Sequence, residues 1–205
     1  MAHTGIFGGT FNPIHNGHLH LLREADAALS FDRILVIPAN IPPHKRAPDL
    51  APGSDRLEMA RLAAAGMDKV FVSDIELKAR GKSYTILTME RLHALFPGDR
   101  FTLLMGADML LTFDKWYRWQ DILRLADLAA FARNDGEEAA LLQKAAELPG
   151  ARVIRTEPLP LSSTQVRETL MSGGDASAMV PEAVLRYIKR RRLYEPPLPA
   201  PEGRL

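Results

Sequence analysis

Short apolar runs alternate along this chain with longer segments in which apolar residues recur at every third or fourth position. Residues 33–38 are apolar after Arg33 and end at a proline, as is typical of a strand buried on both faces of a parallel sheet. Leu19, Leu22 and Ala25 instead lie on one face of a helix. Repeated over the chain, this alternation predicts a doubly wound α/β fold with a mostly parallel sheet and C-terminal helices.

The predicted strands occupy residues 5–7, 33–38, 69–72, 101–106, 128–132 and 153–155. The predicted helices occupy residues 19–29, 56–65, 83–96, 121–125, 137–147, 162–171 and 181–193. Ser54 or Asp55 is expected to cap the second of these helices. Residues 1–195 are expected to form one domain, and the proline-rich tail 196–205 is expected to be disordered.

Four segments directly follow predicted strands. They are Gly8-Gly9, residues 42–46, residues 106–108 and Arg133. In a doubly wound sheet, ligands bind beyond the carboxyl ends of the strands, where the strand order reverses. We therefore expect these segments to converge on one crevice.

The first nineteen residues contain a candidate phosphate site. Gly8-Gly9 follows a strand, and His15 and His18 bracket the start of a helix. Paired glycines let backbone N–H groups approach a ligand, and a helix N-terminus attracts anions. The two imidazoles add donors, so the segment predicts a nucleotide phosphate site. A bare His-x-Gly-His could equally be two histidines in a turn, and a zinc site is disfavoured because no cysteine or HExxH helix accompanies it.

A second candidate lies near the other end of the chain, in the sequence LSSTQVR at residues 161–167. Ser162 and Gln165 have the spacing of a capping box, which explains the helix start but leaves Arg167 without a role. Hydroxyls and free N–H groups at a helix start, with an arginine one turn later, would make a second anion site.

Composition narrows the function classes. The 205 residues carry a net charge of +1, which offers no overall attraction to nucleic acid or membranes. The chain has no cysteine, which excludes disulfides, thiolate catalysis and cysteine-ligated zinc. It shows neither an apolar run of membrane-spanning length nor a signal-peptide pattern. We expect a cytoplasmic protein with no nucleic-acid or membrane partner.

Taken together, the two phosphate motifs resemble the signature of the nucleotidyltransferase α/β superfamily, which has a Rossmann-like fold and holds the triphosphate of ATP or CTP on its HxGH motif. Three further segments are similar to those of bacterial nicotinate-mononucleotide adenylyltransferases. They are Pro42-Pro43-His44-Lys45, Ser83-Tyr84-Thr85 and Trp116-Tyr117. The resemblance covers roughly residues 3 to 194.

This resemblance implies transfer of AMP from ATP to nicotinate mononucleotide, giving nicotinate adenine dinucleotide and pyrophosphate, with Mg²⁺ bound to ATP and no metal site on the protein. The implied catalytic residues are His15, His18, Lys45 and Arg167. The implied ATP-binding residues are Gly8, Gly9, Thr10, Phe11, Gly106, Asp108, Arg133, Ser163 and Thr164. The implied mononucleotide-binding residues are Thr85, Trp116 and Tyr117, with Trp116 as an exposed ring that stacks on the pyridine.

Several alternatives stay open at this point. Lys45 could be a solvated loop charge, Trp116 could belong to the core or to an interface, and the basic run 189–192 could simply complement a helix C-terminus. Where the family often has proline after Arg133 and aspartate at position 87, this chain has Asn134 and Leu87. Rival functions are adenylylation of nicotinamide mononucleotide or another phosphomonoester, a regulator without turnover, and a synthetase fragment. A homo-oligomer, with aromatic residues near Trp119 at its interface, is also left open.

Overall fold

The computed structural model describes residues 1–40, 50–79, 81–132, 136, 138–157 and 159–195. Lys45, Arg133, the Pro42–Lys45 motif and the tail 196–205 lie outside the described residues, so the expectations for them stay predictions.

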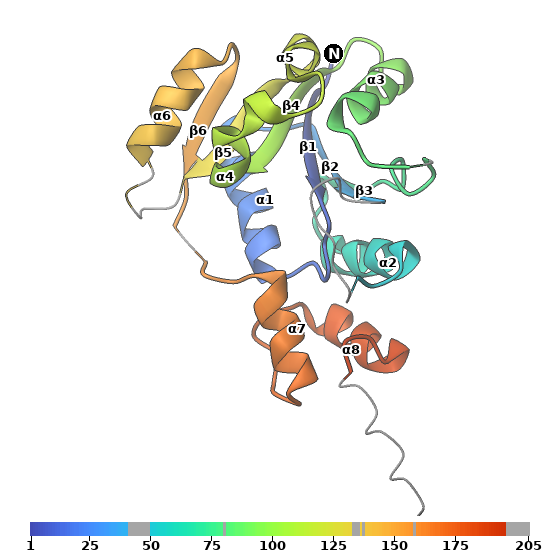
Figure 1. Ribbon diagram of the computed structural model, residues 1–205. Coiled ribbons are helices and arrows are strands. Elements are labelled where there is room, and N and C mark those ends of the chain that lie inside the picture. Colours follow the sequence, from blue (N-terminus) through green and yellow to red (C-terminus); the bar gives the residue numbers. More distant parts are fainter. Residues whose placement is uncertain (41–49, 80, 133–135, 137, 158, 196–205) are drawn as a thin grey trace, which may run out of the picture.

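Six strands form one sheet in the order β3-β2-β1-β4-β5-β6, and all five pairings are parallel. The strands are β1 (His3–Gly9), β2 (Arg33–Pro38), β3 (Val70–Val72), β4 (Arg100–Gly106), β5 (Asp127–Ala132) and β6 (Ala151–Arg155). The chain builds outward from β1 to β3, then returns to place β4 on the other side of β1. The strand order therefore reverses between β1 and β4, which confirms the doubly wound fold (Figure 1).

Eight α-helices and one 3₁₀ helix are formed by the described residues. They are α1 (Asn16–Leu29), α2 (Gly53–Ala64), α3 (Thr85–Leu95), α4 (Ala107–Leu111), η1 (Phe113–Lys115), α5 (Trp119–Leu125), α6 (Glu138–Glu147), α7 (Ser163–Met171) and α8 (Glu182–Arg191). No helix in the described part of the chain has the length and apolar character needed to cross a membrane.

The central strands are apolar at successive positions because both faces of the sheet are covered. In β2, Val36 belongs to the buried cluster that includes residues of α1, α2 and α8, whereas its neighbours Leu35 and Ile37 belong to the cluster that includes residues of α3 to α6. Successive side chains of a strand point to opposite faces, so each face needs its own apolar set. The continuous apolar run of β2 is thus the sequence signature of burial between two helix layers (Figure 1).

The structure corrects one cap and adds two elements. Pro52, and neither Ser54 nor Asp55, precedes the first turn of α2. Asp55 is instead buried and accepts hydrogen bonds from Tyr187 and Arg191 of α8. The short helices α4 and η1 were not predicted, because segments of five and three residues are too short to show a helical period. The capping box of Ser162 and Gln165 is confirmed.

Candidate active site

The last two residues of β1 are glycines, one with exposed backbone and one packed against a ring. A Cβ at Gly8 would have no atom within 4 Å, so this part of the strand end is open. A Cβ at Gly9 would lie 2.8 Å from the ring of Phe11, which is buried and has a φ of +48°. Gly9 therefore admits the Phe11 ring, and Gly8 is the glycine whose backbone a ligand can reach.

The two histidines of the first motif stack on each other at the start of α1. Their ring centroids are 3.7 Å apart with an interplanar angle of 31°. The backbone N–H of His15 donates to Nδ1 of His18 at 3.2 Å. Because Nδ1 of His18 is an acceptor here, the ring proton of neutral His18 is on Nε2, the nitrogen farther from the backbone.

His15 is buried, with 5% of its surface exposed, and its Nδ1 has no hydrogen-bond partner. Burial lowers the pKa of His15 to about 4. The ring is therefore neutral at pH 7 and can donate from one nitrogen only. Gly17 gives the ring room, since a Cβ at position 17 would lie 3.0 Å from Nδ1 of His15.

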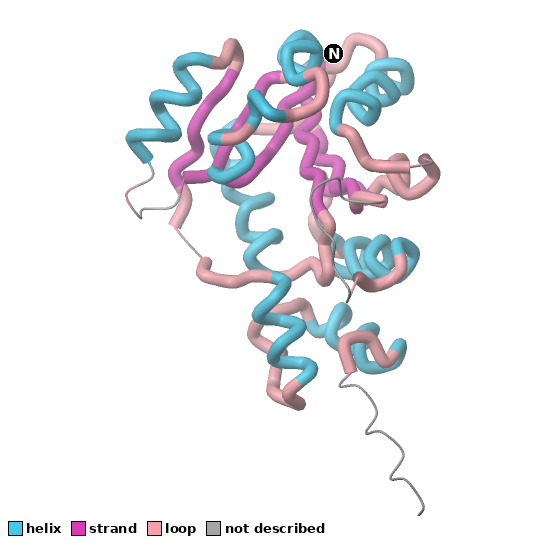
Figure 2. The backbone as a smooth tube through the Cα atoms, viewed as in Figure 1, coloured by secondary structure: helices cyan, strands magenta, loops and turns pink. Residues whose placement is uncertain are grey.

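The second motif lies directly against the turn between Gly9 and His15. Ser163 Oγ donates to the carbonyl of Pro13 at 2.9 Å, and Arg167 Nη1 donates to the carbonyl of Asn12 at 2.9 Å. The loop that enters α7 accordingly runs beside the loop that enters α1 (Figure 2). Two segments about 150 residues apart in the sequence thus form one corner beyond the carboxyl end of β1.

Arg167 is half-buried and is held along α7. Its Nη2 lies 3.4 Å from Thr164 Oγ1, while its Nε is buried without a partner. The guanidinium therefore lies in the corner with its Nε–H unpaired by any protein group. Such a donor suits an anion, which can accept the hydrogen bond.

Asn12 is a further residue of this corner that the sequence analysis missed. Its Oδ1 accepts from Tyr194 Oη at 2.7 Å and from the backbone N–H of Ala51 at 3.0 Å. Burial raises the pKa of Tyr194, so its hydroxyl keeps its proton. The only sequence signal was the turn-forming pair Asn12-Pro13, which says nothing about distant partners.

At the carboxyl end of β4, Gly106 precedes α4, and a Cβ at this position would lie 2.8 Å from Oδ1 of Asp108. The exposed Asp108 carboxylate is therefore folded back over the strand end, next to the point where the strand order reverses.

The structure brings the segments expected to bind the mononucleotide together. Thr85 is the first residue of α3, and the Tyr84 ring lies 5.0 Å from the Tyr117 ring. The expected exposure of Trp116 is wrong: it is half-buried and packs on Phe113 with ring centroids 5.3 Å apart. Within the pair Trp116-Tyr117, the exposed aromatic residue is Tyr117, with 56% of its surface exposed.

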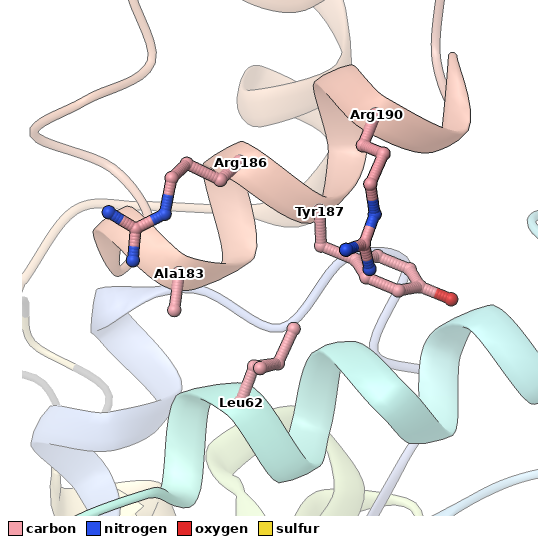
Figure 3. A pocket seen from close by; sticks show the side chains of 5 residues that line it. All are labelled: Leu62, Ala183, Arg186, Tyr187 and Arg190. Atoms are coloured by element: carbon pink, nitrogen blue, oxygen red, sulfur yellow. The ribbon is translucent and has the colours of Figure 1, made fainter.

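A separate hollow of about 310 Å³ lies between α2 and α8 (Figure 3). It is lined by Leu62, Ala183, Arg186, Tyr187 and Arg190, none of which belongs to the predicted site. Arg186 pairs with Glu182 on its own helix, and the Arg190 guanidinium lies 5.3 Å from the centre of the Tyr187 ring. These cations already have partners, and we assign no ligand to this hollow.

Known proteins resemble this chain over nearly its whole length. A cytidylyltransferase-like family profile matches residues 6–169. A protein of Synechococcus sp. (strain JA-2-3B'a(2-13)) named probable nicotinate-nucleotide adenylyltransferase is 39% identical over 198 residues, which cover 94% of this chain and 96% of the relative. A Geobacter sulfurreducens protein with the same name is 36% identical over 210 residues, covering 93% and 97%.

Solved structures agree on the fold. Plasmodium falciparum nicotinic acid mononucleotide adenylyltransferase complexed with NaAD has a TM-score of 0.79 at 19% sequence identity, covering 95% of this chain and 98% of that one. The same protein complexed with APC has a TM-score of 0.78.

Proposed function

The chain belongs to the nicotinate-nucleotide adenylyltransferase family, and we propose that the corner formed by its two helix starts holds the triphosphate of ATP during transfer of AMP to nicotinate mononucleotide. The products are nicotinate adenine dinucleotide and pyrophosphate. The observation that carries this proposal is the contact of Ser163 and Arg167 with the carbonyls of Pro13 and Asn12. It supports the proposal because it brings the two motifs into contact beside the point where the strand order reverses.

The reaction needs no general base. Its nucleophile is the 5′-phosphate of the mononucleotide, whose second pKa lies near ~6, so an oxygen is already ionised at neutral pH. Catalysis then consists of holding the two phosphates in line and stabilising the charge that develops on the α-phosphate and on the leaving pyrophosphate.

Each motif has a distinct part in this scheme. His18 donates from Nε2 to the α-phosphate region, and the neutral ring of His15 packs against the His18 ring. Ser163, through its backbone N–H, and the side chains of Thr164 and Arg167 would hold the departing β- and γ-phosphates. The exposed backbone at Gly8 lets the triphosphate approach, while Thr10 and Phe11 shape the turn below it. Lys45 and Arg133, which lie outside the described residues, would add charge from the loops after β2 and β5.

The remaining assignments concern the two nucleosides. Asp108 would accept a hydrogen bond from the adenosine ribose, with Gly106 leaving room for it. Thr85 and the backbone N–H of Tyr117 would bind the pyridine carboxylate. Trp116 would stack on the pyridine ring with the part of its side chain that Phe113 does not cover. We also propose that residues 1–195 work as one domain, because Tyr194 and α7 both contact the turn after β1.

The metal is expected to arrive with ATP. The described residues contain no group of three or more His, Cys, Asp or Glu side chains able to cage an ion. Mg²⁺ prefers phosphate and water oxygens as ligands, and an ion bound to the triphosphate of ATP has such ligands. When bound, it would neutralise charge on the leaving pyrophosphate.

The function is tested by measuring pyrophosphate release from ATP with nicotinate mononucleotide, nicotinamide mononucleotide and a panel of small phosphomonoesters. We expect the highest kcat/KM with nicotinate mononucleotide. Equal or higher kcat/KM with the amide would change the acceptor, and no release with any acceptor would leave a nucleotide-binding protein without turnover.

A further inference from the structure

Arg56 of α2 is an arginine buried behind the active-site turn, with only 1% of its surface exposed. All of its hydrogen bonds go to backbone carbonyls. Nη1 donates to Thr10 at 2.8 Å and to Ala39 at 2.7 Å, Nη2 donates to Asn40 at 3.3 Å, and Nε donates to Ala51 at 3.0 Å. One planar group therefore joins the turn after β1, the segment after β2 and the segment before α2.

This arrangement is unusual for a buried cation. Within the described part of the chain, no carboxylate lies at ion-pair distance from Arg56, and burial lowers its pKa. An unpaired buried charge is costly, and carbonyl oxygens compensate it only where several converge. The adjacent Asp55 does not serve as the partner, because its carboxylate accepts from Tyr187 and Arg191 of α8.

The contacts continue from Asn40 to the other side of the site. The backbone N–H of Asn40 donates to Ser83 Oγ at 2.9 Å, and the Ser83 hydroxyl is one of the groups that lower the pKa of Glu76, which burial raises. Glu76 also accepts from Thr88 Oγ1 of α3 at 2.7 Å. Ser83 lies two residues before Thr85, so this chain of contacts ends where the pyridine carboxylate is expected to bind.

We propose that Arg56 is a positioning residue that holds the triphosphate turn and the mononucleotide segment at a set distance, acting through Asn40 and Ser83. The inference rests on the proposed function, since it assigns ATP to one end of the contact chain and the mononucleotide to the other. Arg56 itself touches neither substrate. Its guanidinium fork sets where the Thr10 carbonyl and the Asn40 backbone lie, and the in-line geometry of the two phosphates depends on both.

The decisive variant is Arg56→Lys, which keeps the charge but cannot span the four carbonyls. We expect KM for ATP and KM for the mononucleotide each to rise about tenfold, the effect of losing one hydrogen bond to a charged group. The matched control is Arg33→Lys at the opposite end of β2, where Arg33 bonds Thr4 and Asp99 and lies 4.0 Å from the centre of the Phe96 ring. The control should lower the melting temperature yet leave both KM values unchanged. Equal KM changes in the two variants would overturn the proposal.

A milder variant keeps the proposal testable if Arg56→Lys does not fold. Ser83→Ala removes only the hydroxyl that accepts from the Asn40 backbone. We expect KM for the mononucleotide to rise several-fold with KM for ATP unchanged. If Arg56→Lys folds, the double variant should cost less than the sum of the two single changes, because both act on one chain of contacts. An unchanged KM in Ser83→Ala overturns the link to the mononucleotide.

Binding separates this proposal from the proposed function. If the parent protein shows no adenylyl transfer, the proposed function fails, but the affinity for Mg²⁺-ATP can still be measured by calorimetry. Weaker ATP binding in Arg56→Lys than in Arg33→Lys would still support positioning of the triphosphate turn. Equal affinity in parent, Arg56→Lys and Arg33→Lys would refute it.

Discussion

The two halves of the candidate site are built differently. Around the triphosphate corner, hydrogen bonds from Ser163, Arg167 and Tyr194 cross more than 140 residues of sequence to reach Asn12 and Pro13. Around the mononucleotide segment, Tyr84, Trp116 and Tyr117 make ring contacts, and Tyr117 is largely exposed.

The difference follows from what each half has to do. Charge stabilisation at a phosphate depends on donors that are already in place, because donors that must reorganise lose most of their benefit. An aromatic face recognises a flat ring mainly by contact area, and it tolerates small shifts. We therefore expect the corner to be rigid, and the rings of the mononucleotide side to adjust beyond the contact that fixes Ser83.

The largest expected effect is the loss of a donor from the rigid half. His18→Ala should lower kcat by about 10²–10³, the loss typical of one transition-state donor. Stability should change little, since His18 is only partly buried. The control is His20→Ala on the same helix, whose ring bonds the Glu157 carbonyl away from the corner. A kcat for His18→Ala equal to that of the control would remove His18 from the mechanism.

Next in size is the pH dependence of folding that comes from His15. Its pKa in the folded protein is about 4, below the ordinary value of 6.5, so the unfolded chain binds a proton first as the pH falls. His15 therefore makes the protein about 2 kcal/mol less stable at pH 5 than at pH 7. Urea unfolding at both pH values measures this loss.

His15→Asn should remove that part of the pH dependence, and asparagine is a favoured residue before a helix. The comparison with the parent is needed because burial and Arg100 also lower the pKa of His3, with the same sign of effect. An identical loss in parent and variant would mean that His15 titrates normally.

A smaller effect is expected in the adjustable half. Trp116→Ala should raise KM for the mononucleotide about tenfold and leave KM for ATP unchanged, as expected for one ring contact in a substrate pocket. Tyr117→Ala is the matched variant, because only its backbone N–H is assigned to the substrate. If Tyr117→Ala has the larger effect, the exposed tyrosine ring is the stacking partner. An equal rise in KM for both substrates would contradict the division of the site into two halves.

The smallest expected effect is on the contact between the C-terminal segment and the corner. Tyr194→Phe removes a hydrogen bond to Asn12 Oδ1 while Ala51 still donates to that oxygen. We expect a loss of about 1 kcal/mol in unfolding free energy and a fall in kcat smaller than that of His18→Ala. Chemical denaturation and steady-state kinetics measure the two, and full activity would show that the corner does not need this contact.

Much of the fold could be predicted because local patterns carry it. The β2 run at residues 33–38 and the capping box at Ser162 follow from short-range geometry, and both are confirmed. The cap of α2 was predicted wrongly because the Asp55 carboxylate accepts hydrogen bonds from Tyr187 and Arg191 of α8 instead. Trp116 was expected to be exposed because its neighbours in sequence are polar, but its own side chain faces Phe113.

The sequence by itself determined the order of strands and helices, the two phosphate motifs and the family, since each is written in neighbouring residues. Only the tertiary structure decided that Arg56 joins Thr10 to Asn40, that Tyr194 reaches Asn12, and that His15 is a neutral, buried ring. The physical reason is the distance along the sequence over which each effect acts. Periodicity and capping act over a few residues, whereas burial and hydrogen bonding of a side chain depend on which distant segments the folded sheet brings beside it.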